Sequence, residues 1–257
     1  MAFAFTPTLA MNTAEKTARK LHDLADADRA AILQRFFKTG PGQYGEGDRF
    51  LGVVVPETRT VVRNHRHEAQ IADVDALTAS PWHEIRLAGF LMLIEIYRRQ
   101  KTDDGRRATV DFYLSILDRG NNWDLVDLVA PKILGDWIVR NPSEAALLYE
   151  LAAMDGHLWH QRVAIVATMA PVRKGRHDDT LRIAGKLLNH PHDLIHKATG
   201  WLLREVGKHG GMELLLEFLD NHAAEMPRTM LRYAIERLHD TQRRHYLTLP
   251  RTKTKKG

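Results

Sequence analysis

The sequence contains no cysteine. This absence excludes disulfides, catalysis by a thiolate, and zinc or iron–sulfur sites that depend on cysteine. No apolar run approaches the ~18–20 residues that a membrane-spanning helix needs. The first residues, Met1–Pro7, have no basic segment ahead of an apolar core, so we expect no secretory signal. Together these absences predict a soluble cytoplasmic protein with no membrane partner.

The chain also lacks a strong excess of charge of either sign. Its 257 residues include 37 Lys and Arg against 32 Asp and Glu, a net charge of +5. Four of the basic side chains lie in residues 251–257, so residues 1–250 carry a net charge of only +1. The arrangement of charge, rather than its total, must therefore decide whether the protein binds a polyanion. We expect residues 1–250 to form one domain and residues 251–257 to be a basic, disordered tail.

Apolar residues recur with the period of an α-helix along almost the whole chain. Helix breakers such as Asn141-Pro142 and Gly210-Gly211 fall between these segments. Only Phe50–Pro56 has the character of a strand. It has no second strand to pair with, so we interpret it as an extended loop or as the lead into a helix near Pro56. The other predicted helical segments are 14–37, 82–100, 106–118, 143–154, 158–170, 178–188, 192–208, 211–222 and 226–238.

A short motif repeats inside these helical segments. A charged residue followed by small or aliphatic residues begins at Arg86, Asp127, Arg162, Lys197 and Arg232, with spacings of 41, 35, 35 and 35 residues. A fixed period of this size, with two helices in each unit, is typical of α-solenoids built from HEAT-like repeats. The sequence therefore predicts an all-α, right-handed solenoid with a concave binding face. The alternative is chance recurrence in a helical chain rich in Ala, Leu and Arg.

The repeat predicts which residues meet. Corresponding positions of packed helices lie roughly 8–10 Å apart, so Asp127, Arg162 and Lys197 should form a row. Trp123 lies four residues before Asp127 and Trp201 four residues after Lys197, and residues at i and i+4 share a helix face. The five side chains should converge on one surface. Asp127 beside Arg162 is expected to stay ionised, since an opposite charge favours the anion. The alternative is that these residues are buried packing and structural ion pairs.

The other motifs in the sequence do not predict a catalytic, cofactor or metal site. Gly40–Gly47 contains G-x-G-x-x-G, but a helical segment and not a strand precedes it, so a structured loop is expected in place of a dinucleotide site. There is no G-x-S-x-G motif for a serine nucleophile. The close histidine pairs lack a carboxylate that would complete a metal site, so we predict no metal and no cofactor. These pairs are His65/His67, His157/His160 and His190/His192.

Basic residues near helix starts and turns are candidates for contacts with phosphates, against the alternative of a solvated helix face. Among them are Lys197 and Arg204, which lie in the same predicted helix as Trp201, and Arg173 and Lys174.

Several stretches together resemble the bacterial DNA alkylation repair family, the alkylpurine DNA glycosylases built from HEAT-like repeats. The resemblance runs from about residue 15 to 245, and its most specific segments are Asn121–Asp127 and Gly200–Lys208. The other matching stretches are 36–40, 44–53, 82–86 and 158–165.

This resemblance implies an enzyme of base excision repair that acts on double-stranded DNA, and we expect the protein to be a monomer. By similarity, Trp123, Asp127 and Trp201 form the catalytic cleft and Arg162 supports DNA binding and activity. The implied substrates are cationic purines alkylated at N3 or N7, read without an enclosing base pocket. Asp127 is then expected to stabilise the sugar cation and orient water, while Lys197 and Arg204 join Arg162 in binding DNA. The alternative is a non-catalytic helical module that binds damaged or branched DNA.

Overall fold

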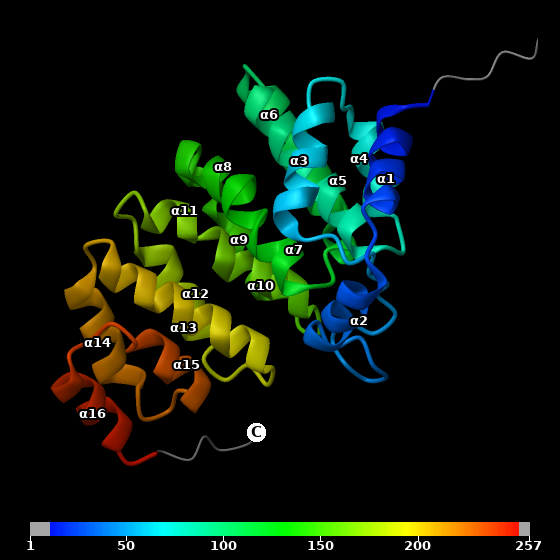
Figure 1. The fold of residues 1–257 in the computed structure, drawn as a ribbon. Helices are drawn as coiled ribbons and strands as arrows, with labels where there is room; N and C mark the ends of the chain where they lie inside the picture. The colour runs from blue at the N-terminus through cyan, green and yellow to red at the C-terminus, as the bar shows by residue number, and fades with distance from the viewer. Residues whose placement is uncertain (1–10, 252–257) are drawn as a thin grey trace, which may run out of the picture. The chain divides into compact units, whose positions relative to one another are not determined.

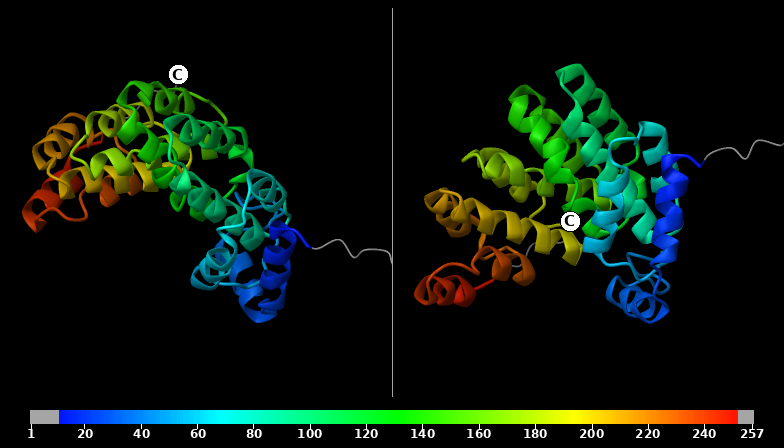
Figure 2. Two further views of the ribbon diagram at one scale, coloured as in Figure 1. Left: turned by 90° about the horizontal axis from the view of Figure 1, so that it is seen from above. Right: turned by 45° about the horizontal axis from the view of Figure 1, so that its top comes forward.

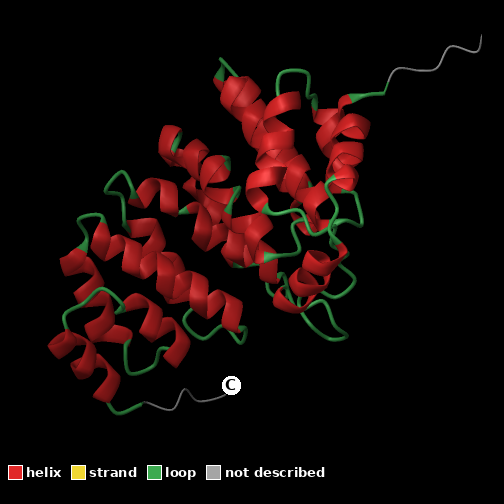
Figure 3. Ribbon diagram, viewed as in Figure 1, coloured by secondary structure: helices red, strands yellow, loops and turns green. Residues whose placement is uncertain are grey.

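The computed structural model describes residues 11–251, and within that range the chain is helical with no strand (Figure 3). A single isolated bridge between Arg49 and Trp82 is the nearest approach to sheet pairing there. None of the helices in residues 11–251 is both long enough and apolar enough to cross a bilayer. The all-α class predicted from the sequence is confirmed. The basic tail predicted at residues 251–257 lies, apart from Arg251, outside the described residues.

The chain divides into two compact units, residues 1–109 and 110–257. The single domain predicted over residues 1–250 stays a prediction. In the first unit, α1 packs against α3, α4 and α5, and α3 and α4 each pack against α5. Its helices are α1 (Thr13–Asp23), α2 (Ala27–Phe36), α3 (Val55–His65), α4 (Ile71–Thr78) and α5 (His83–Arg99), and the unit boundary falls within α6 (Asp103–Ser115).

The strand-like stretch before α3 is an extended loop, as predicted, and α3 begins at Val55 with Pro56 in its first turn. The buried carboxylate of Glu84 explains why this stretch needs no partner strand. It accepts hydrogen bonds from the backbone N–H groups of Leu51, Gly52 and Val53 at 2.9, 2.8 and 3.2 Å. Three backbone donors that would otherwise be buried and unpaired are thereby satisfied.

The second unit contains the remaining helices (Figure 1). They are η1 (Leu117–Arg119), α7 (Trp123–Asp127), η2 (Ala130–Lys132), α8 (Leu134–Arg140), η3 (Pro142–Ala145), α9 (Ala146–Ala152), α10 (Leu158–Ala167), α11 (Met169–Val172), α12 (Asp178–Lys186), α13 (Asp193–Lys208), α14 (Met212–His222), α15 (Arg228–Ala234) and α16 (Asp240–Thr248).

The 35-residue spacing corresponds to helices that pack in sequence. Helix α7 packs against α10, α10 against α13, and α13 against α15, and these four helices carry Asp127, Arg162, Lys197 and Arg232. The views in Figure 2 show the same succession, from green to orange. The intervening helices pack on this row. Helix α9 packs on α10, and both α12 and α14 pack on α13. The helical repeat predicted from the sequence therefore orders the second unit.

The structure departs from the predicted helices in places. The segment 14–37, for which the sequence allows one or two helices, forms two, because Asp26 caps α2 by accepting a hydrogen bond from the backbone N–H of Arg29 at 2.9 Å. The segment 158–170 divides at Thr168 into α10 and α11. Helices α4, α8 and α16 were not predicted at all.

Candidate functional site

Asp127 and Arg162 form the centre of the candidate site, on α7 and α10 of the second unit. Arg162 Nε donates to Asp127 Oδ1 at 2.9 Å, and Nη2 donates to Oδ2 at 2.7 Å. A planar guanidinium that meets both carboxylate oxygens fixes the orientation of the carboxylate as well as its charge. The two residues are 35 positions apart in sequence, so the repeat correctly predicted that they meet.

The guanidinium of Arg162 is itself fixed by its surroundings. Its side chain is 6% exposed, whereas that of Asp127 is 18% exposed. Its third nitrogen, Nη1, donates to the backbone carbonyl of Leu194 in the first turn of α13. All three nitrogens are thus engaged within the protein. Arg162 is placed to position Asp127, and its phosphate-binding role stays a prediction.

Burial affects the pKa of the Asp127 carboxyl more than the neighbouring guanidinium of Arg162 does. Burial raises the pKa of Asp127 above its usual range, and the charge and hydrogen bonds of Arg162 oppose that rise. The spacing in the sequence predicts the opposing influence of Arg162 but not the burial of the carboxyl. The adjoining Tyr113 hydroxyl is fully buried, and burial together with the charge of Asp127 raises its pKa, which keeps it protonated.

A cleft of about 360 Å³ in the second unit contains Asp127 and Trp201. Trp201 lies on α13 and is partly exposed. Trp123, the first residue of α7, is also partly exposed, and its backbone N–H donates to Asn122 Oδ1. Trp123 is not among the lining residues, so the structure joins two of the three predicted catalytic residues in one cleft. The lining residues are Asp127, Leu128, Pro131, Lys132, Asp136, Val139, Met169, Ala170, Arg173, Lys174 and Trp201.

The two other predicted DNA-binding residues are ion-paired. Lys197 Nζ lies 2.7 Å from Asp193 Oδ2, one turn earlier on α13. Arg204 pairs with Glu236, and also with Glu205 at 3.4 Å. Neither residue lines the cleft. Both pairs reach solvent through at least one exposed partner, which is where an ion pair contributes little to stability and exchanges readily.

Other cations flank the cleft. Arg173 and Lys174, in the turn after α11, line it with exposed side chains. Within residues 11–251 neither side chain takes part in a hydrogen bond or an ion pair. Lys132 on η2 also lines the cleft. From the sequence, Arg173 and Lys174 are only two of many basic residues that could contact phosphates. Nothing in the sequence marked Lys132 as a residue of the cleft, because its position there depends on how η2 packs.

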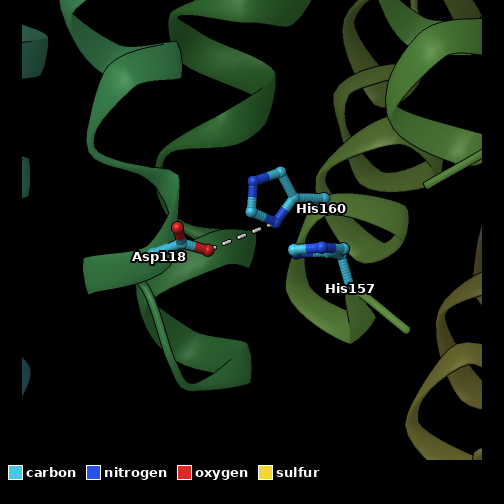
Figure 4. Close-up of side chains that lie close together, drawn as sticks. All are labelled: Asp118, His157 and His160. Carbon is cyan, nitrogen blue, oxygen red and sulfur yellow. Dashed lines mark ion pairs between the residues drawn. The ribbon is translucent and has the colours of Figure 1, made fainter. Parts of the chain in front are cut away.

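A third group in the second unit is a set of possible metal ligands. Asp118, His157 and His160 bring one ligand atom each within 4.8 Å of one another (Figure 4). His157 and His160 were one of the histidine pairs considered from the sequence. The carboxylate lies 39 residues earlier and could not be linked to them by any local pattern.

Two comparisons with known proteins give a match. A family model described as DNA alkylation repair enzyme matches residues 17–238. The chain also resembles the structure of a predicted DNA alkylation repair enzyme from Enterococcus faecalis, with a TM-score of 0.66 and 16% sequence identity. That similarity covers 84% of this chain and 97% of the other, and at such low identity it supports the fold alone. No curated protein sequence matches the chain.

Proposed function

Because the chain belongs to the DNA alkylation repair enzyme family, we propose that it is a DNA glycosylase for cationic N3- or N7-alkylated purines in duplex DNA. Family membership gives it a role in DNA repair and implies that it binds DNA. The proposal adds the reaction, the substrate and a monomeric enzyme that needs no cofactor. The observation that carries it is the Arg162-bound carboxylate of Asp127 in a cleft shared with Trp201.

The chemistry of the substrate explains why one carboxylate suffices. A purine alkylated at N3 or N7 carries a positive charge, so it leaves as a neutral base without being protonated. When the bond between C1′ and the base nitrogen breaks, its electron pair neutralises the base and the sugar becomes oxocarbenium-like. Water then adds to C1′, loses a proton, and leaves an abasic sugar. The only positive charge that the protein must stabilise is on the sugar.

Asp127 has the position and charge for that task. Its two oxygens are oriented by Arg162, and the site is partly shielded from water, which strengthens electrostatic stabilisation. The raised pKa of its carboxyl also makes the anion a better acceptor for the proton of the attacking water. Asp127 would therefore stabilise the sugar cation and orient water, and Arg162 would hold it in place.

The aromatic and basic residues would hold the nucleotide. An indole face attracts a cation by about 0.5–2 kcal/mol, so Trp201 in the cleft and Trp123 at the start of α7 would favour a cationic purine over a neutral one. Arg173 and Lys174 at the edge of the cleft, with Lys197 and Arg204 on α13, would bind phosphates.

The proposal is tested with the wild-type protein and duplexes that contain one defined lesion. We expect release of free 7-methylguanine or 3-methyladenine, and no release of the neutral base O6-methylguanine, measured by chromatography. Salt-dependent DNA affinity without release of either cationic base would instead support the non-catalytic DNA-binding module. An absence of salt-sensitive DNA affinity would indicate a protein-binding scaffold.

A further inference from the structure

Asp118, His157 and His160 form a compact group that the proposed reaction does not use. Asp118 belongs to η1, His157 is the residue before α10, and His160 lies in the first turn of α10. The imidazole rings of the two histidines have centroids 5.0 Å apart. Figure 4 shows the ring of His160 directed at Asp118, with the ring of His157 beside it. Among the described residues, no other set of three His, Asp or Glu side chains gathers in this way.

The spacing of the donors is compatible with one shared metal ion. His160 Nδ1 lies 3.7 Å from Asp118 Oδ1, which is within reach of an ion pair when the imidazole is protonated but too long for a hydrogen bond. Two ligands that are each about 2.0–2.2 Å from a tetrahedral zinc ion lie about 3.4 Å apart. His157 supplies the third donor, since its ligand atom lies within 4.8 Å of those of Asp118 and His160.

We propose that Asp118, His157 and His160 bind one divalent first-row transition-metal ion of the zinc class. Two imidazoles and one carboxylate are a donor set that this class prefers, whereas Mg²⁺ and Ca²⁺ prefer ligands that are all oxygen. Asp118 and His157 are exposed, so the ion can enter from solvent and water can complete its coordination.

The protonation state of the buried ligand agrees with this role. An imidazole must be neutral to bind a metal ion. Burial lowers the pKa of His160 below its usual range, although Asp118 opposes that shift. This direction of shift favours the neutral imidazole, the form that binds a metal ion.

The bound ion would connect two elements next to the candidate site. Helix η1 leads into α7, which carries Asp127, and α10 carries Arg162 two residues after His160. Both η1 and α7 pack on α10. An ion shared by Asp118 and His160 would cross-link η1 to α10 and stabilise the second unit. The ion lies outside the cleft and takes no part in the proposed reaction, so the two proposals fail separately.

The test is a Zn²⁺ titration of the full chain, prepared without a histidine tag and freed of metal with a chelator. Isothermal titration calorimetry should give one saturable site per chain, and the melting temperature should rise with Zn²⁺ but not with Mg²⁺. Asp118→Asn and His157→Gln change exposed side chains and should leave the fold intact. Each should weaken Zn²⁺ affinity by at least ~10-fold and abolish the rise in melting temperature.

The matched control is the double variant His65→Gln with His67→Gln. It removes another close histidine pair, which belongs to no three-ligand group among the described residues. This variant should bind Zn²⁺ as the wild type does. The absence of a saturable site in the wild type would overturn the proposal. Wild-type affinity in either Asp118→Asn or His157→Gln would also overturn it.

Discussion

The Asp127 carboxylate is subject to two opposing influences that determine how it can act. Burial raises its pKa, and the guanidinium of Arg162 lowers it, with burial the larger effect. The proposed reaction requires the anion, because only a negative charge stabilises the sugar cation. In the proposed reaction, Arg162 would therefore extend the range of pH over which Asp127 acts. This role is separate from any contact between Arg162 and DNA.

Replacing Arg162 should change the pH dependence of base release. If Asp127 acts as the anion, base release should fall as the pH drops through the pKa of its carboxyl. Arg162→Gln removes the opposing charge and raises that pKa further, which moves the acid limb of the single-turnover profile to higher pH. Arg162→Lys keeps a charge and should move the limb less. Because removing one partner of a buried ion pair typically costs about 3–5 kcal/mol, the free energy of unfolding should be measured alongside.

An unchanged acid limb in Arg162→Gln, with a lower rate at every pH, would contradict this role and favour a direct contact of Arg162 with DNA.

For single residues, the sequence predicted which side chains lie near one another but not all the contacts that they make. The 35-residue interval brought Asp127 and Arg162 together, and the i, i+4 spacing placed Trp123 on the helix of Asp127. The contact of Arg162 with the Leu194 carbonyl was not predictable, since it depends on the exact height of α13 against α10. Asp118 was missed because only the packing of η1 on α10 brings it to the histidines.

At the scale of helices, α13 and α15 can pack closely because Gly200 has no side chain. A Cβ atom on Gly200 of α13 would lie 2.3 Å from the Met230 carbonyl oxygen and 2.6 Å from the Tyr233 Cβ, both on α15. The Met230 carbonyl is part of the helix backbone, so it cannot move aside as the end of a flexible side chain can. Gly200 is the fourth residue of the repeated motif that begins at Lys197, so the small residue found in the sequence marks a helix contact.

Gly200→Ala should therefore destabilise the protein by about 1–3 kcal/mol through overpacking. Gly185→Ala is the matched control, because Gly185 is exposed on α12 and its added Cβ would meet no atom within 4 Å. Alanine is the better helix former there, so this variant should gain about 0.5–1 kcal/mol. Urea unfolding of both variants measures the difference. Equal stability of the two would show that α13 and α15 are not closely packed at Gly200.

The elements that the sequence failed to predict share a physical cause. Helix α16 buries only Tyr246, so it has almost no apolar stripe. Helices α4 and α8 have 8 and 7 residues, which is too short for a helical period to stand out. The long helices α5 and α13 were predicted within one residue of their observed ends, because 17 and 16 residues contain several turns of pattern.

For the whole molecule, the net charge of +5 is poor evidence for DNA binding, since residues 1–250 carry only +1. The proposal relies on placement instead: the exposed cations Arg173 and Lys174 line the same cleft as the Arg162-bound carboxylate of Asp127. Deleting residues 251–257 should weaken DNA affinity by less than ~10-fold at physiological salt, and should leave single-turnover base release unchanged. Fluorescence anisotropy against salt concentration measures the first effect. Loss of base release on deletion would assign the tail a function that the cleft does not explain.

The most direct test of the account is single-turnover release of 7-methylguanine from a duplex by Asp127→Asn, with enzyme in saturating excess. Removing a preorganised stabilising group typically costs ~10²–10³-fold in rate, so we expect a loss of that size with DNA affinity retained. Asp179→Asn is the control, because Asp179 is also partly buried and accepts a hydrogen bond from Tyr149 at 2.7 Å, but does not line the cleft. It should match the wild type. Release by Asp127→Asn at the wild-type rate would contradict the central role of this carboxylate.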